Sequence, residues 1–316
     1  MQTSSATQFH GPMDRRHFLR TGGCLLAGFA VGARGAGKPS APPAAAKATI
    51  PLKLGIRAAS MKMAGNLDVI RAAAGLPGIM GVELQVTSGR PNLHDAETLR
   101  RYKKEADRWA LRIPTLAGLL DRGVEISSPA AADNIRLAVH AAEFLGSSAL
   151  LLAFFGKNAP DMTKESSYGP LVTMLRGVAP CAADAGVTVG LENSLNPADN
   201  ARLVDLVAHP AVRVYYDPHN MATYGYAEQA VPGVKLLGKE RICAVHVKNG
   251  NKLIGEAGPI DWAAAFRAFN EIGYEGWYIY ETSHDDLADC IADTRQNNSF
   301  LREHVRMPVA SAQEAG

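Results

Sequence analysis

The chain has 316 residues, of which 47% are hydrophobic and 20% are charged, and its formal net charge is +2. This length is enough for one large domain. Lysine and arginine do not gather in the clusters that bind nucleic acids, and no uninterrupted apolar run reaches the ~18 residues expected of a membrane span. We therefore expect no nucleic-acid partner and no membrane span.

The first 46 residues are predicted to be an export signal and a Pro/Ala-rich linker. Arg15 and Arg16 precede Phe18-Leu19 and a mildly apolar stretch over residues 21–33, a pattern that resembles a twin-arginine signal. A disordered basic tail is the alternative interpretation. We accordingly predict a periplasmic protein in which residues 47–316 form a single domain.

Strand-like and helix-like segments alternate along this domain. The predicted strands are Leu52–Arg57, Gly81–Val86, Ile113–Gly118, Ala149–Phe155, Val187–Glu192, Val212–Asp217, Ile242–Val247 and Trp277–Glu281. The predicted helices are Leu67–Ala74, Asp95–Ala110, Ala130–Phe144, Tyr168–Ala185, Asp199–Val207, Val231–Leu237, Trp262–Glu271 and Asp285–His304. Eight strands separated by helices indicate parallel βαβ units.

A closed (β/α)8 TIM barrel is the architecture that eight such units favour. Continuously apolar strands such as Ala149–Phe155 suit a parallel sheet that is buried on both faces. A doubly wound open sheet is the alternative, but the Gly-rich dinucleotide fingerprint is missing after the first strand.

The last four strands each end in a side chain that can bind a metal, namely Glu192, Asp217, His246 and Glu281. In a barrel the carboxyl ends of the strands converge on one rim. Three carboxylates and one imidazole suit a single divalent cation such as Mn²⁺, Mg²⁺, Co²⁺ or Zn²⁺. Each residue alone has a simpler explanation, as a salt bridge, a turn or a core histidine. Their recurrence favours a metal site.

Such a site predicts chemistry at the carbon next to a carbonyl. A bound cation polarises the carbonyl and stabilises an enediolate when the neighbouring C–H proton is removed. The reaction then needs a base on one face of that carbon and an acid on the other. Glu192 and Glu281, from strands on opposite sides of the rim, are the candidates for these two roles.

Several motifs over most of the domain resemble the xylose isomerase-like TIM barrels of the sugar phosphate isomerase/epimerase family. They are Gly81-Val82-Glu83-Leu84, Gly190-Leu191-Glu192-Asn193, Tyr216-Asp217-Pro218-His219-Asn220, His246-Val247-Lys248-Asn249 and Gly258-Pro259-Ile260-Asp261-Trp262. The resemblance implies that Glu192, Asp217, His246 and Glu281 are the metal ligands. It also implies that Glu192 and Glu281 transfer the proton, as in the ketose-epimerase branch.

Further site residues follow from position and from the resemblance. Lys248 lies two residues after His246, on the same strand face, where it is either a catalytic group for a carbonyl oxygen or a solvated loop lysine. Glu83 is expected to bind a substrate hydroxyl, with an outward salt bridge as the alternative. Glu256 lies in the loop after the seventh strand and is expected to close over the ligand.

Two predicted substrate-binding residues, His219 and Asn220, depart from the ketose-epimerase pattern. That branch often has a histidine where Asn220 stands, and His219 takes a position that is often glycine. We therefore expect a metal-dependent sugar isomerase or epimerase, with one alternative in the same superfamily. The alternative is a lyase, dehydratase or hydrolase acting on a keto-sugar, a keto-inositol or a 3-keto-glycoside.

Two other classes are less favoured. Apurinic-site endonucleases share the barrel, but their trinuclear zinc clusters use extra histidines on early strands, and none occurs on the predicted second to fourth strands. A non-catalytic binding protein is opposed by the presence of all four candidate ligands. We expect a small carbohydrate as the substrate, and the sequence is compatible with a homo-oligomer.

Overall fold

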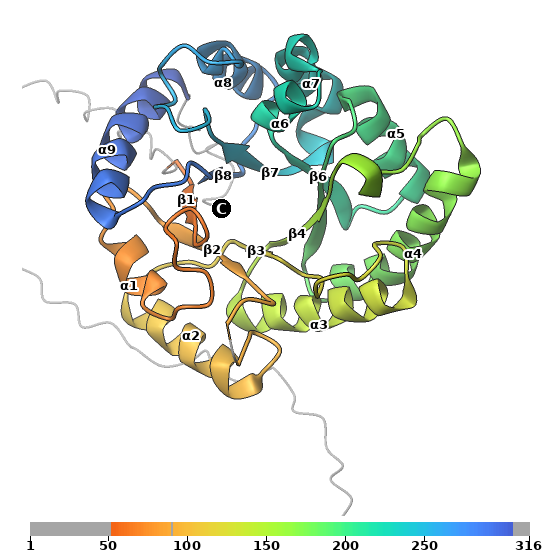
Figure 1. Ribbon diagram of the computed structural model, residues 1–316, viewed down its shortest axis with the longest axis horizontal. Coiled ribbons are helices and arrows are strands. Elements are labelled where there is room, and N and C mark those ends of the chain that lie inside the picture. Colours follow the sequence, from red (N-terminus) through yellow and green to blue (C-terminus); the bar gives the residue numbers. More distant parts are fainter. Residues whose placement is uncertain (1–51, 90, 306–316) are drawn as a thin grey trace, which may run out of the picture. The chain divides into compact units, whose positions relative to one another are not determined.

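Eight parallel strands pair in chain order and close on themselves, with β1 beside β8 and helices around the outside (Figure 1). The predicted (β/α)8 barrel is therefore confirmed. The computed structural model describes residues 52–89 and 91–305. The predicted export signal lies outside the described residues, and its boundary with the barrel stays a prediction.

The strands and helices have the following bounds. The strands are β1 (Leu54–Arg57), β2 (Gly81–Gln85), β3 (Thr115–Ala117), β4 (Ala149–Phe154), β5 (Thr188–Asn193), β6 (Val212–Tyr216), β7 (Ile242–Val247) and β8 (Trp277–Tyr280). The helices are α1 (Val69–Ala74), α2 (Ala96–Arg108), α3 (Pro129–Leu145), α4 (Glu165–Asp184), α5 (Pro197–Val207), α6 (Pro218–Thr223), α7 (Ala227–Arg241), α8 (Trp262–Glu271) and α9 (Leu287–His304), with a 3₁₀ turn η1 (Gly156–Asn158). Among these helices, none is both long enough and apolar enough to cross a bilayer.

Two short elements, η1 and α6, were not predicted. Asp217 was expected to end a strand; β6 ends one residue earlier, at Tyr216, and Asp217 caps α6. Its side chain accepts a hydrogen bond from the backbone N–H of Asn220, and Pro218 occupies the first helical turn. An aspartate cap followed by proline is a strong helix start, so the same residue both ends the strand region and begins the helix.

Side chains of the strands alternate between two cores. A small inner core fills the barrel, and its members are Ala117, Leu151, Tyr215, Ala244, Trp277 and Ile279. A larger outer core lies between the strands and the helices and includes Leu150, Leu152 and Val245. Because successive strand residues point to opposite faces, the residue two places after an inner-core residue also points into the barrel.

This alternation aims the predicted ligands at the mouth of the barrel. Tyr215, Ala244 and Ile279 belong to the inner core, and each precedes a predicted ligand by two residues. Gly190 takes the corresponding place below Glu192. A Cβ at Gly190 would lie 2.6 Å from Cys243 Sγ and 3.1 Å from the Leu150 carbonyl oxygen, so glycine permits the close approach of the strands at this level.

Candidate metal centre

The four predicted ligands meet at the carboxyl ends of β5 to β8. Glu192 lies in β5 and His246 in β7, while Asp217 and Glu281 directly follow β6 and β8. One ligand atom from each of the four residues lies within 4.8 Å of the other three. Glu192, Asp217 and His246 are buried, and the Glu281 side chain is 12% exposed. The geometry expected from the strand ends is thus present in the structure.

The ligand atoms contact one another directly. His246 Nδ1 lies 3.0 Å from Glu192 Oε1 and 3.2 Å from Glu281 Oε2. The two oxygens of Asp217 have different partners. Oδ1 accepts a hydrogen bond from the backbone N–H of Asn220 at 3.0 Å, and Oδ2 lies 2.7 Å from Lys248 Nζ. The Asn220 side-chain amide donates to Glu192 Oε1 at 2.9 Å. The protein therefore fixes each ligand while leaving polar atoms that face the shared space.

This arrangement fits a divalent cation. Ligand atoms that share one ion at ordinary coordination distances lie at most about 4.4 Å apart, so a spread of 4.8 Å requires only small side-chain adjustments. Three carboxylates would more than offset the charge of a divalent ion, and the imidazole supplies a nitrogen that suits transition metals. His246 would bind through Nδ1, since this nitrogen faces the carboxylates.

Buried polar groups contact His246 on the side of the ring that faces away from the other three ligands. Glu83, on β2, is fully buried, and its Oε1 lies 3.4 Å from His246 Nε2 and 3.2 Å from Arg57 Nε. Its other oxygen accepts hydrogen bonds from Thr115 Oγ1 at 2.9 Å and Tyr215 OH at 2.8 Å. Glu83 thus faces His246 and Arg57 through one oxygen as an ion pair and is anchored by hydrogen bonds through the other, which favours a role in holding His246. Binding of a substrate hydroxyl by Glu83 stays a prediction.

Glu83 and His246 form a buried pair whose charges support each other. Burial alone would lower the pKa of His246, but the carboxylates of Glu192 and Glu83 outweigh it and raise the pKa to about 9. Burial would likewise raise the pKa of Glu83, yet His246 and Arg57 bring it down to about 2. In the metal-free protein near neutral pH the imidazole is therefore protonated, and a metal must displace that proton.

Two cations hold Glu281. Lys248 Nζ lies 2.6 Å from Glu281 Oε2, and Arg57 forms an ion pair with Glu281 Oε1. The Trp262 indole N–H donates to the Lys248 carbonyl at 3.0 Å, which fixes the backbone beyond β7. Lys248 thus points into the site. Arg57 was missed from sequence, although it ends β1 just as the ligands end their strands, so the same rule applied to cations would have found it.

The predicted substrate-binding residues His219, Asn220 and Glu256 lie at different distances from the four ligands. His219 is half-buried in α6, and burial lowers its pKa, with the charges of Asp217 and Lys248 acting on it in opposite directions. Asn220 is at the site, but its side chain is bound to Glu192. The Glu256 side chain is exposed in the loop after β7, and its carbonyl accepts a hydrogen bond from Asn249 Nδ2 at 2.9 Å. Loop closure by Glu256 stays a prediction.

Comparison with protein families matches residues 70–304 to the family described as xylose isomerase-like TIM barrels. The chain belongs to this family. A sequence comparison with curated proteins gives no significant match.

Several solved structures have the same fold over most of this chain. D-psicose 3-epimerase in the presence of D-fructose has a TM-score of 0.68 at 16% identity, over 80% of this chain and 99% of the other. The IOLI protein with a zinc atom has a TM-score of 0.67 at 16% identity, over 81% and 100%. The 3-keto-D-glucoside 4-epimerase YcjR from E. coli has a TM-score of 0.60 at 18% identity, over 80% and 99%. At these identities the likeness is one of fold.

Replacing the Glu83 carboxylate should weaken metal binding through His246. We expect Glu83→Gln to raise the Kd for Mn²⁺ or Zn²⁺ by about 10- to 100-fold, measured by titration calorimetry on the metal-stripped protein. In the wild type, affinity should rise with pH up to about 9, because protonated His246 competes with the metal. In the variant the rise should end at a lower pH, because one of the carboxylates that raise the His246 pKa is gone.

Glu97→Gln is the matched control, since the Glu97 side chain is 68% exposed on α2. It should bind metal like the wild type at every pH. An unchanged Kd and an unchanged pH profile in Glu83→Gln would show that Glu83 does not support the ligand. A purely structural defect would lower affinity without moving the pH at which the rise ends.

Proposed function

We propose that this protein is a divalent-metal-dependent sugar isomerase or epimerase that removes a proton next to a carbonyl. The observation that carries the proposal is the convergence of Glu192, Asp217, His246 and Glu281 at one end of the barrel. A cation bound there would polarise the carbonyl and stabilise the negative charge of an enediolate.

Glu192 and Glu281 would move the proton. They come from β5 and β8, which are separated around the ring by β6 and β7, so their carboxylates approach the shared space from different sides. One carboxylate would take the proton from carbon and the other would return a proton to the opposite face. Asn220 and His246 orient Glu192, whereas Lys248 and Arg57 orient Glu281.

Lys248 would stabilise negative charge on a substrate oxygen. Its ammonium lies between Asp217 Oδ2 and Glu281 Oε2, at 2.7 and 2.6 Å, and it is only partly buried. A donor at this position can hydrogen-bond a substrate oxygen on which negative charge develops. His219 and Asn220 complete the same side of the site and would contact the substrate there.

A carbohydrate is the substrate class that the site and the relatives support. Two of the structures that share the fold are described as a D-psicose 3-epimerase and a 3-keto-D-glucoside 4-epimerase. With a divalent ion bound, the charges around the centre would cancel, because the three ligand carboxylates and Glu83 balance Lys248, Arg57 and the ion. This balance favours a neutral sugar over a phosphorylated one.

A lyase, dehydratase or hydrolase acting on a keto-sugar, keto-inositol or 3-keto-glycoside is the second candidate. It would form the same enolate but expel a group from the neighbouring carbon. The observation that favours it is Asn220, which stands where the ketose-epimerase branch often has a histidine and whose amide is bound to Glu192.

Conversion of either glutamate to glutamine tests the proton transfer. We expect Glu192→Gln and Glu281→Gln each to lower turnover by at least ~100-fold, because an amide cannot exchange the proton. The assay incubates the metal-loaded protein with ketoses and 3-keto-glycosides in D₂O and follows deuterium incorporation by NMR. Deuterium with formation of an epimer supports the first candidate, and release of water or aglycone supports the second.

Glu271→Gln serves as the control, since Glu271 lies on the outer helix α8 with a side chain that is 56% exposed. It should exchange deuterium at the wild-type rate. Near-normal exchange in either site variant would remove that glutamate from its role. Bound metal with no exchange on any sugar would instead indicate a non-catalytic binding protein.

We also propose that the protein is exported to the periplasm by the twin-arginine route. The support is the sequence of Arg15 and Arg16 before Phe18-Leu19 and an apolar stretch. Replacing both arginines with lysine should retain the protein in the cytoplasmic fraction, as detected by immunoblotting of cell fractions. Unchanged export of this double variant would contradict the assignment.

A further inference from the structure

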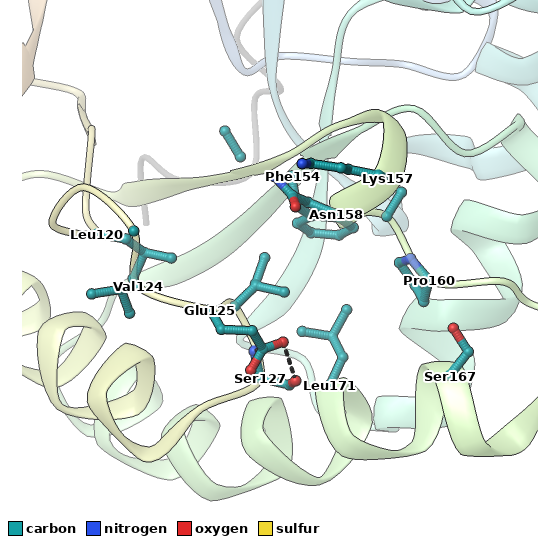
Figure 2. A pocket seen from close by; sticks show the side chains of 14 residues that line it. Leu120, Val124, Glu125, Ser127, Phe154, Lys157, Asn158, Pro160, Ser167 and Leu171 are labelled. Carbon is teal, nitrogen blue, oxygen red and sulfur yellow. Dashed lines mark hydrogen bonds between the residues drawn. The ribbon is translucent and has the colours of Figure 1, made fainter.

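A cavity of about 520 Å³ lies between the loop after β3 and the loop after β4 (Figure 2). Its volume falls within the range of about 300–1,000 Å³ that is typical of small-molecule sites. The side chains that carry the argument are Leu120, Val124, Ser127, Lys157, Asn158 and Leu171. None of these residues belongs to the metal centre, so the cavity is a separate feature of the barrel mouth.

The cavity passes over the tip of β4. It is lined by both Ala153 and Phe154, which are consecutive and therefore point to opposite faces of the strand. Leu151 belongs to the inner core, so Ala153, two residues later, also points into the barrel. Phe154 belongs to the outer core, against the helices. The cavity therefore lies at the end of β4, next to a residue that points into the barrel.

Ala153 brings this cavity next to a metal ligand. In the register of β4 and β5, Ala153 pairs with Glu192, and neighbouring strands lie about 4.8 Å apart. Both side chains point into the barrel, yet Ala153 is exposed, whereas Glu192 is buried. The small side chain of Ala153 therefore stands beside the strand that carries Glu192, at the edge of the cavity. A molecule bound at the centre would extend over Ala153 to reach the cavity, next to the Phe155 ring that stacks on Tyr224.

The lining is amphipathic and carries both signs of charge. The lining combines apolar side chains such as Leu120, Val124 and Leu171 with the oppositely charged Lys157 and Glu125. The Glu125 carboxylate accepts a hydrogen bond from Ser127 Oγ at 2.6 Å (Figure 2). A sugar ring combines apolar C–H faces with hydroxyl edges and is neutral, so it matches this lining better than an ion or an aliphatic chain does.

We propose that this cavity is a second subsite, which holds the second sugar unit of a neutral glycoside while the first ring lies at the metal centre. The proposal rests on the proposed function, because it assumes that a carbohydrate carbonyl binds beside Glu192. It narrows the substrate class from carbohydrates in general to glycosides whose second unit extends over Ala153.

Filling the cavity tests the subsite. Ala159 lines it and has an extended backbone (φ −81°, ψ 141°) that any residue can adopt, so Ala159→Trp places a large ring at the edge of the cavity, where Ala159 packs against the core. Ser127→Trp is a second variant on another segment of the lining. Ser166→Trp is the control, because Ser166 is exposed on α4, next to the lining residue Ser167. Thermal unfolding of each variant establishes that it is folded.

Two probes distinguish binding at the cavity from binding at the metal centre. They are the 3-keto derivative of methyl β-glucoside, which has no second ring, and the 3-keto derivative of cellobiose, which has one. In the wild type we expect the disaccharide to have the lower KM. Ala159→Trp and Ser127→Trp should raise the KM for the disaccharide by about tenfold or more and change that for the methyl glycoside less than about twofold. The control should change neither value.

Equal effects on both probes, or no effect on the disaccharide, would overturn the subsite. If the metal-loaded wild type turns over neither probe, deuterium exchange on ketoses decides the proposed function, and titration calorimetry with the same two probes decides the subsite by itself. Weaker binding of the disaccharide alone in both tryptophan variants would support it. Absence of disaccharide binding to the wild type would reject it.

Discussion

Several carboxylates are buried side by side at the mouth of this barrel, and such burial is costly unless positive charge compensates it. The residues around the centre supply that charge from specific places. Lys248 bridges Asp217 and Glu281, Arg57 bridges Glu83 and Glu281, and His246 lies among the carboxylates as an imidazolium when no metal is bound. A divalent cation would replace the proton of His246 in this balance.

The ligands are held by contacts with residues from other parts of the barrel. Asp217 uses Oδ1 to cap α6, while its Oδ2 faces the centre. His246 directs Nε2 to Glu83 and Nδ1 to the other ligands. Glu281 contacts Arg57 through Oε1 and Lys248 through Oε2. Because these supports come from different strands, the donor atoms are held in position before a cation arrives, which is a common feature of metal centres.

The barrel and the four ligands can be predicted from the sequence because the pattern that indicates them lies within single strands. Apolar strands with a polar last residue can be recognised within about six positions, and the alternation of side chains fixes which way that residue points. Glu192 and His246 were found in this way. The helix α6 was not, because Asp217-Pro218 serves equally well as a turn, and only the hydrogen bond to the N–H of Asn220 distinguishes the two.

The supporting contacts could not be predicted in the same way, because they join residues far apart in the chain. Glu83 and Tyr215 are 132 residues apart, and Arg57 and Glu281 are 224 apart. Which side chains meet inside a barrel depends on strand register as well as on sequence. The cavity over β4 likewise depends on the paths of two loops, and no periodic pattern encodes those paths.

Crystals grown with Mn²⁺ and measured for anomalous scattering test the central claim most directly. We predict one strong anomalous peak, bound by Glu192, Asp217, Glu281 and the Nδ1 atom of His246. A peak held by other residues, or Mn²⁺-saturated crystals in which these four side chains bind no ion, would contradict the account.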